Sequence, residues 1–143
     1  MKTAELDFIV PNSLEAVTLY QSVFEVTNVE ATQYEKGLNE VRFSLHGMKM
    51  HILDENPDYE MYAPKKDQLF PIWVNVTVSD INETLKRADT SGFSLLQPLT
   101  DIPEFGVKNA VIKDPYGYQW MLHEVYETKT TEELNKAMDE KFN

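Results

Sequence analysis

The sequence contains no cysteine, which excludes a disulfide framework and any metal site built on thiolate ligands. Basic residues are also scarce, because 13 Lys and Arg stand against 24 Asp and Glu and are scattered along the chain. The resulting net charge of −11 makes nucleic acid and anionic membrane poor partners. No apolar run is long enough for a signal sequence or a membrane span, so we expect a soluble, cytoplasmic protein.

The first half of the 143 residues has the pattern of a strand, a helix and three further strands. Residues 4–10 begin by alternating, as a strand does, and the segment PNSLEAVTLYQSVFEV then places apolar residues near the helical period. Asn12 and Glu15 form a capping box at the start of that helix. Three β-rich segments follow, VEATQYE, NEVRFSLHG and MKMHILDE, with turns at Gly37 and Gly47. The order predicted for this half is therefore βαβββ.

The same order starts again after a proline-containing break, NPDYEMYAPKKDQLFP. A strand (IWVNVTV) and a helix (SDINETLKRADTSG) are followed by three strand-like segments, FSLLQPL, VKNAVIKD and YQWMLHEV. Asp80 and Glu83 repeat the capping pair, and Gly117 precedes the last strand as Gly47 does in the first half. Chance would explain a single match, but the agreement of element order, caps and turns favours an internal duplication.

We therefore predict one α+β domain in four parts. These are module one at residues 4–56, a linker at 57–70, module two at 71–126 and a C-terminal helix at 129–142. Thr130 and Glu133 form a third capping box, and a narrow apolar stripe on this last helix predicts packing on the domain or on a partner chain. A solvated tail is the alternative interpretation.

The helix segment EAVTLYQSVF and the closing segment VIKDPYGYQWMLHE, set in two βαβββ halves, resemble the vicinal oxygen chelate superfamily. That superfamily contains glyoxalase I, bleomycin resistance proteins and extradiol dioxygenases, and LYQSVF and DPYGYQW are most similar to its PhnB-like branch. The resemblance covers residues 4 to about 126. A D-P-x-G turn suits any hairpin, so by itself it is weak evidence for the family. It becomes fairly strong evidence because it lies between these strands and opposite a matching half. The family fold implied is two curved sheets that make a partly open, eight-stranded barrel around a cleft.

Metal-using members of this family place one ligand, typically His or Glu, on the first and the last strand of each half. The equivalent positions in this sequence are Glu5, His51, Trp73 and Met121. Tight sites for divalent ions need three or four protein ligands, and only two of these four residues can bind a metal, so we expect no metal cofactor. Strand alternation places Asp7 and His123 on the same faces as Glu5 and Met121. These two displaced residues leave open the alternative of a rebuilt metal site.

The expected lining of the cleft is otherwise aromatic and mildly polar. Trp73, Asn75 and Thr77 alternate along one strand, and an aromatic surface with a few polar groups is typical of small-molecule pockets. Alternation also turns His123 toward the cleft and Glu124 away from it, so the pair cannot ligate one ion from a regular strand. The alternative is that Trp73 and Met121 fill the cleft and leave no pocket.

Three functions remain open at this point. The favoured one is a metal-independent protein that binds a small, planar or aromatic molecule in its cleft. The second is a lyase or isomerase of the glyoxalase type, which uses a divalent metal or takes Glu5 or His51 as its general base. The third is a dimeric interaction module with a filled cleft. We also expect a homodimer, because a two-fold axis would bury the exposed sheet edges.

Overall fold

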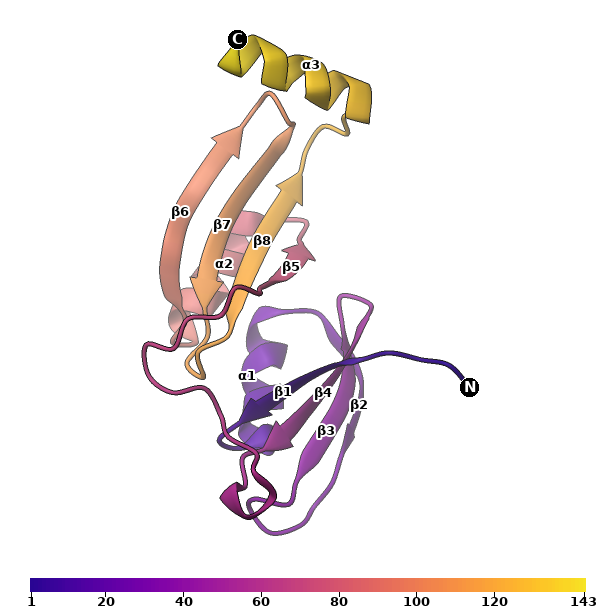
Figure 1. Cartoon of the computed structure of the whole chain (residues 1–143), viewed down its shortest axis with the longest axis vertical. Coiled ribbons are helices and arrows are strands. Elements are labelled where there is room, and N and C mark those ends of the chain that lie inside the picture. Colours follow the sequence, from indigo (N-terminus) through magenta and orange to yellow (C-terminus); the bar gives the residue numbers. More distant parts are fainter.

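The computed structural model describes all 143 residues and divides them into two βαβββ modules and a C-terminal helix (Figure 1). Module one consists of β1 (Leu6–Val10), α1 (Ser13–Val23), β2 (Val26–Ala31), β3 (Glu40–Leu45) and β4 (Met48–Asp54). Module two consists of β5 (Val74–Thr77), α2 (Ile81–Thr90), β6 (Ser94–Ile102), β7 (Val107–Lys113) and β8 (Gln119–Val125). The linker contains one short 3-10 turn, η1 (Pro57–Tyr59), and the chain ends with α3 (Thr131–Phe142).

Each module folds into its own four-stranded mixed sheet. The strand orders are β1-β4-β3-β2 and β5-β8-β7-β6, so the first strand of a module lies beside its last strand. That pair is parallel in both modules, and the other neighbours are antiparallel. The α+β class and the two βαβββ modules are therefore confirmed. The eight strands form two open sheets and not a closed barrel.

Side-chain caps begin all three helices at the predicted residues. The side chains of Asn12, Asp80 and Thr130 each accept a hydrogen bond of 3.1 Å from the backbone amide three residues further on. These caps satisfy amides that have no partner inside the helix. None of the helices is both long and apolar enough to cross a membrane.

The last strand of each module also supports the start of that module's helix. Asp54 of β4 accepts a hydrogen bond of 2.7 Å from the backbone amide of Ser13, where α1 begins. Glu124 of β8 accepts one of 3.0 Å from the amide of Ile81, where α2 begins. A carboxylate at a helix N-terminus also complements the helix dipole. Glu124 therefore faces α2, as the strand alternation predicted.

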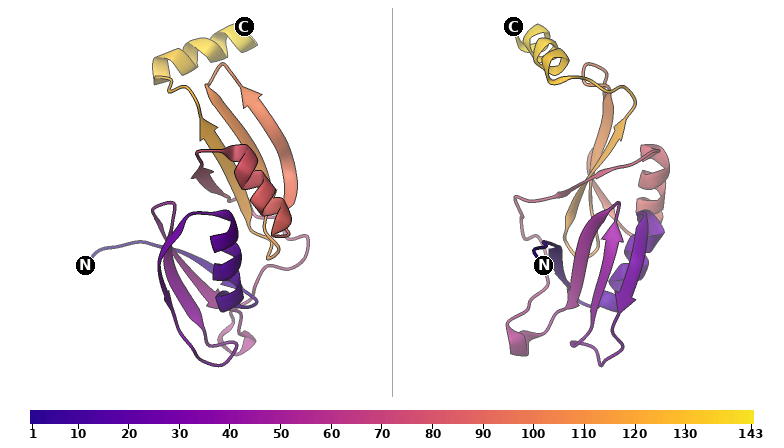
Figure 2. Two further views of the ribbon diagram at one scale, coloured as in Figure 1. Left: turned by 180° about the vertical axis from the view of Figure 1, so that it is seen from behind. Right: turned by 90° about the vertical axis from the view of Figure 1, so that its right-hand side faces the viewer.

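One continuous core joins the two modules. Figure 2 shows α1 and α2 on the same side of the molecule, where each covers one face of its sheet. Trp120 of β8 is fully buried, and its ring lies 4.6 Å from that of Phe24 and 5.3 Å from that of Tyr20. Aromatic pairs of this kind add to the stability that burial of their area provides. The two modules thus share one hydrophobic core.

The predicted strand over VEATQYE is wrong in its bounds, because β2 ends at Ala31 and a loop follows. Asn39 is buried and holds this loop in place: its side-chain oxygen accepts hydrogen bonds from the Tyr34 amide and the Thr32 hydroxyl. The side-chain amide of Asn39 donates to the Tyr34 carbonyl in return. An asparagine that satisfies local backbone groups in this way competes with strand pairing.

Candidate functional site

The faces of the two sheets that α1 and α2 leave uncovered, called the open faces below, carry the predicted site residues. Alternation decides which side chains reach them. In β1, Phe8 and Val10 are buried on the helix side, while Asp7 points the other way and is exposed. In β5, Val74 and Val76 are buried and Asn75 and Thr77 are exposed.

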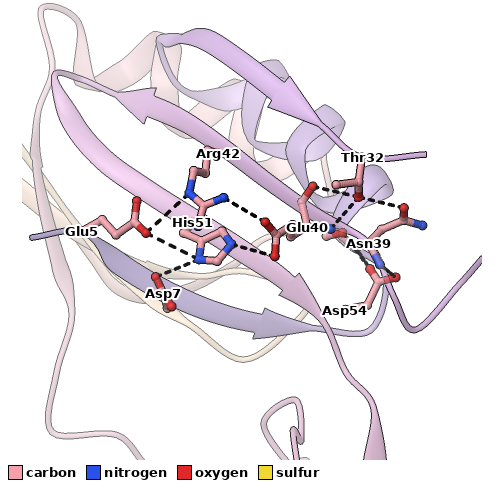
Figure 3. A network of polar contacts seen from close by, with 9 residues as sticks. Glu5, Asp7, Thr32, Asn39, Glu40, Arg42, His51 and Asp54 are labelled. Atoms are coloured by element: carbon pink, nitrogen blue, oxygen red, sulfur yellow. Dashed lines mark hydrogen bonds and ion pairs between the residues drawn. The ribbon is translucent and has the colours of Figure 1, made fainter. Parts of the chain in front are cut away.

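On the open face of module one, the structure brings Glu5, Asp7 and His51 together (Figure 3). Asp7 lies directly beside His51 in the parallel pair of β1 and β4. Atom Nδ1 of His51 is 3.2 Å from an Asp7 carboxylate oxygen and 3.7 Å from Oε1 of Glu5. One ligand atom from each of the three residues lies within 4.8 Å of the other two.

Arg42 and Glu40 of β3 complete this cluster. Arg42 is the antiparallel neighbour of His51. Its Nη1 lies 2.8 Å from Oε1 of Glu40, and its Nε lies 3.6 Å from Oε1 of Glu5 (Figure 3). A guanidinium is charged at any ordinary pH and donates through a planar fork. Glu5 and Glu40 are therefore already partnered by a cation that the chain itself supplies, whereas Asp7 contacts His51 alone.

His51 is the buried centre of the cluster, with only 5% of its surface exposed. Its Nε2 is buried and makes no hydrogen bond, although an oxygen of Glu40 lies 3.5 Å away. Buried ring nitrogens of histidine usually make a hydrogen bond, and this one has only the long contact with Glu40. The ring stands between carboxylates on both sides, which holds it in place but leaves little of its surface open to a substrate.

The open face of module two carries no such cluster. Asn75 lies beside Met121, and Thr77 lies beside His123, in the parallel pair of β5 and β8. Met121 and His123 are half-buried. Trp73 comes directly before β5 and is 46% exposed. This face offers hydrogen-bonding and apolar groups, and His123 is its one imidazole among these residues, with no carboxylate beside it.

The strand registers make Asp7 with His51 in module one the counterpart of Asn75 with Met121 in module two. A four-cornered metal site would need two ligands from each pair of strands. Module two supplies Trp73, Asn75 and Met121 at these places, and only the side-chain oxygen of Asn75 is a usual ligand of a hard divalent ion. In module one, Glu5 already contacts Arg42 and His51, and Asp7 already contacts His51. The residues present therefore do not fit the metal centre that the four positions imply.

One small apolar pocket lies between the two modules. It has a volume of about 160 Å³, and its lining includes Asp7 and Phe8 from β1 together with Trp73 and Tyr118 from module two. Of the predicted site residues it thus brings Asp7 and Trp73 together. Its volume is below the several hundred Å³ of usual ligand pockets, so it suits the insertion of a ring edge better than enclosure of a whole ligand.

Sequence reasoning did not single out Asp114, a buried carboxylate that accepts hydrogen bonds at both of its oxygens. It is buried, and its Oδ2 accepts hydrogen bonds from the Tyr20 hydroxyl at 2.7 Å and from Nε1 of Trp120 at 3.0 Å. Its Oδ1 accepts from the backbone amides of Tyr116 and Tyr118. Burial raises the pKa of Asp114 despite these bonds. The available signal was its place at the first position of the D-P-x-G turn, where Asp commonly accepts from the turn's amides.

Tyr118, in the same turn, fastens module two to the edge of β1. Its hydroxyl donates to the carbonyl of Ile9 at 2.7 Å and accepts from the amide of Ile9 at 3.0 Å. Its ring stacks on Phe8 with centroids 3.7 Å apart. Gly117 before it has φ of 106° and packs against Pro64, which explains the glycine of the turn.

Comparison with known proteins places this architecture in a family. Residues 3–122 match the family model described as Glyoxalase/Bleomycin resistance protein/Dioxygenase superfamily. The chain belongs to this superfamily, which is the vicinal oxygen chelate group that the sequence resembled. An uncharacterized protein of Mycobacterium bovis is 22% identical over 134 residues, which cover 91% of this chain and 88% of the relative.

Two solved structures illustrate the shared fold. TioX from Micromonospora sp. ML1 is 21% identical, with a TM-score of 0.60 over 90% of this chain and 100% of TioX. The fosfomycin resistance protein FosX from Listeria monocytogenes, solved with Mn(II) and sulfate, is 15% identical, with a TM-score of 0.65 over 96% of this chain and 97% of FosX. At these identities the likeness establishes the fold alone.

Proposed function

We propose that this protein is a cytoplasmic, metal-independent member of the superfamily that binds a small planar or aromatic molecule on the open face of module two. The observation that carries the proposal is Trp73, a large aromatic side chain that is 46% exposed beside an apolar pocket. Tryptophan offers a wide apolar surface at a small cost in conformational entropy, and it is enriched where proteins bind ligands and partners.

The polar neighbour of Trp73 supports the same proposal. Asn75 is exposed beside Met121 on the same face. Its side chain can donate and accept a hydrogen bond, so it suits a ligand with an uncharged polar group. A face that combines aromatic area with a few hydrogen-bonding groups is the usual composition of a small-molecule site.

The burial of His51 disfavours an enzyme that uses this residue as its general base. A general base must come within hydrogen-bonding distance of the proton that it removes. His51 is 5% exposed, and both of its ring nitrogens face carboxylates of its own module. Glu5 is more open, yet it is shared between His51 and Arg42. This geometry supports a structural role for the cluster.

The proposal is tested by titrating a panel of planar aromatic compounds while tryptophan emission is recorded. The chain has two tryptophans, and Trp120 is fully buried, so a ligand stacked on the open face should quench Trp73. Trp73→Leu should weaken binding by about 1 kcal/mol or more. Tyr59→Leu is the matched control, because Tyr59 is also an exposed aromatic residue but lies in the linker. An affinity that is unchanged by Trp73→Leu would place the site elsewhere.

A further inference from the structure

A second cavity lies at the other end of module two, between α3 and the ends of β7 and β8. It has a volume of about 470 Å³, which is within the range of small-molecule pockets. Val107 and Val125 form its floor on the sheet, and Leu134 and Met138 form its wall on α3. Trp73 belongs to the opposite end of the sheet, because it precedes Val74, the neighbour of Trp120 near the start of β8.

The wall of this cavity is a helix that packs on little else. None of the residues of α3 is buried, and Met138 is 42% exposed. Figure 1 shows α3 beyond the ends of β6, β7 and β8, away from the core of either module. An amphipathic helix normally gains most of its stability by packing its apolar stripe. Two residues of the apolar stripe of α3, Leu134 and Met138, face the cavity, so a molecule in the cavity would supply packing for them.

The polar groups of the cavity define the kind of molecule that fits. Asn109 and His123 are direct neighbours across β7 and β8, and both are half-buried in its lining. Neither side chain makes a hydrogen bond or an ion pair within the chain. Each can both donate and accept, so together they can hold one uncharged polar group of a ligand.

Charge narrows the ligand class further. The charged pair at the cavity, Lys129 and Glu127, is joined at 2.9 Å and so presents no unpaired cation. The chain as a whole carries a net charge of −11, which repels anions.

We propose that this cavity binds an uncharged, largely apolar ring compound with one hydrogen-bonding group, which contacts Asn109 and His123 and seats α3 on the sheet. The site does not include Trp73, and the proposal for it does not depend on the proposed site at Trp73. Two apolar walls that face each other supply the affinity, and the polar pair orients the ligand.

N-phenyl-1-naphthylamine is a suitable probe, because it is uncharged, has fused rings and one N–H group, and fluoresces more strongly in apolar surroundings. The full-length protein should bind it saturably at one site per chain. 8-Anilinonaphthalene-1-sulfonate has the same rings with an added sulfonate, and it should bind at least 10-fold more weakly, since no unpaired cation faces it. Equal or tighter binding of the sulfonate would overturn the proposed ligand class.

Two variants locate the probe. Leu134→Gln and Met138→Gln should each weaken its binding at least 5-fold, because they place an amide in the apolar wall. Phe142→Gln is the matched control on the same helix, since Phe142 is 67% exposed and lies outside the cavity. Circular dichroism should show equal helix content in all three, as α3 buries no residue.

The outcomes separate this site from the one at Trp73. Loss of probe binding in Leu134→Gln and Met138→Gln, with full binding in Trp73→Leu and Phe142→Gln, supports the cavity site. If Leu134→Gln and Met138→Gln bind the probe as tightly as the wild type does, the cavity site is overturned, whether or not Trp73→Leu has an effect. Failure of aromatic ligands to quench Trp73 would overturn the proposed function and leave the cavity site intact.

Discussion

Asp114 shows how one buried carboxylate organises the contact between the modules. Its two oxygens accept from a tyrosine and an amide pair that belong to different parts of the core, so the turn is fixed with respect to both modules. Each oxygen of Asp114 accepts from two donors, so the lone pairs of the carboxylate are all in use. One of these donors is the Nε1–H of Trp120, which bonds to Asp114 alone.

Asp114→Asn should therefore destabilise the protein by about 1–3 kcal/mol, because the new amide would point a donor at the donor of Trp120. Urea unfolding measures the change, and Asp89→Asn on the exposed side of α2 is the control. An equal midpoint for the two variants would refute the role assigned to Asp114.

The difference in unfolding free energy between the wild type and Asp114→Asn should depend on pH, and the direction follows from the pKa of Asp114. Burial raises the pKa of Asp114 above its usual value of 3.8, so the unfolded state releases this proton first as the pH rises. The stability contributed by Asp114 is thus greatest below that usual value and decreases as the pH rises through the raised pKa. The advantage of the wild type over Asp114→Asn, measured by urea unfolding, should decrease over the same interval.

The places of single residues could be predicted from the sequence where strand alternation or a helix cap decides them. His123 and Glu124 fall on opposite faces of β8, and Asn12, Asp80 and Thr130 cap their helices, because these features depend on near neighbours in the chain. The contact of Arg42 with Glu5 and that of Asp114 with Tyr20 join residues far apart in the chain. No local pattern could reveal these two contacts.

Among the elements, the turn between β7 and β8 has a role beyond joining two strands. Tyr118 offers its hydroxyl to both backbone groups of Ile9 at the outer edge of β1, where no strand pairs. Exposed sheet edges are liabilities that proteins cover or block. The turn of module two therefore closes the edge of module one and positions Asp7 beside Trp73 at the pocket between them.

Tyr118→Phe should cost about 1–3 kcal/mol of unfolding free energy, because the backbone of Ile9 loses its partner while the stacking on Phe8 remains. Urea unfolding again provides the measurement. Tyr59→Phe, which alters a tyrosine that is 67% exposed, should have no effect. A Tyr118→Phe protein as stable as this control would show that the edge contact contributes nothing.

The same tyrosine predicts how stability changes in alkali. Burial raises the pKa of Tyr118 from its usual value of 10.0 to about 12, so the unfolded state ionises first. The stability that this shift contributes is fully present below pH 10.0 and is lost as the pH rises toward about 12. The difference in urea midpoint between the wild type and Tyr118→Phe should therefore narrow over that interval.

At the scale of the whole molecule, the two open faces differ in chemistry. Module one presents carboxylates and Arg42, whereas module two presents Trp73, neutral polar groups and an outer strand, β6, with exposed leucines. The duplication and the fold class could be predicted from the sequence, because the order of the apolar patterns and the turns of the first half recur in the second half. The resemblance also implied one curved sheet from each half, which the structure confirms. The assignment to the PhnB-like branch stays a prediction.

These unpaired surfaces support the predicted homodimer. Leu95, Leu96 and Leu99 on β6 are 56%, 46% and 39% exposed, and an edge strand of this kind pairs readily with another chain. A two-fold axis would bury the same strand on both copies without open polymerisation. Light scattering at micromolar concentration should give twice the chain mass of 16.6 kDa. A mass of 16.6 kDa would contradict the dimer.

The central proposal is that this member of the superfamily works without a metal, because Trp73 and Met121 stand at two of the four ligand positions and Arg42 already pairs with Glu5 and Glu40 beside His51. The most direct test is the metal content of the wild-type protein after equilibration with Mn(II) or Zn(II) and desalting. We predict far less than one ion per chain, while Arg42→Met, which frees Glu5 and Glu40, should retain more. One tightly held ion per wild-type chain, lost in Asp7→Asn, would contradict the account.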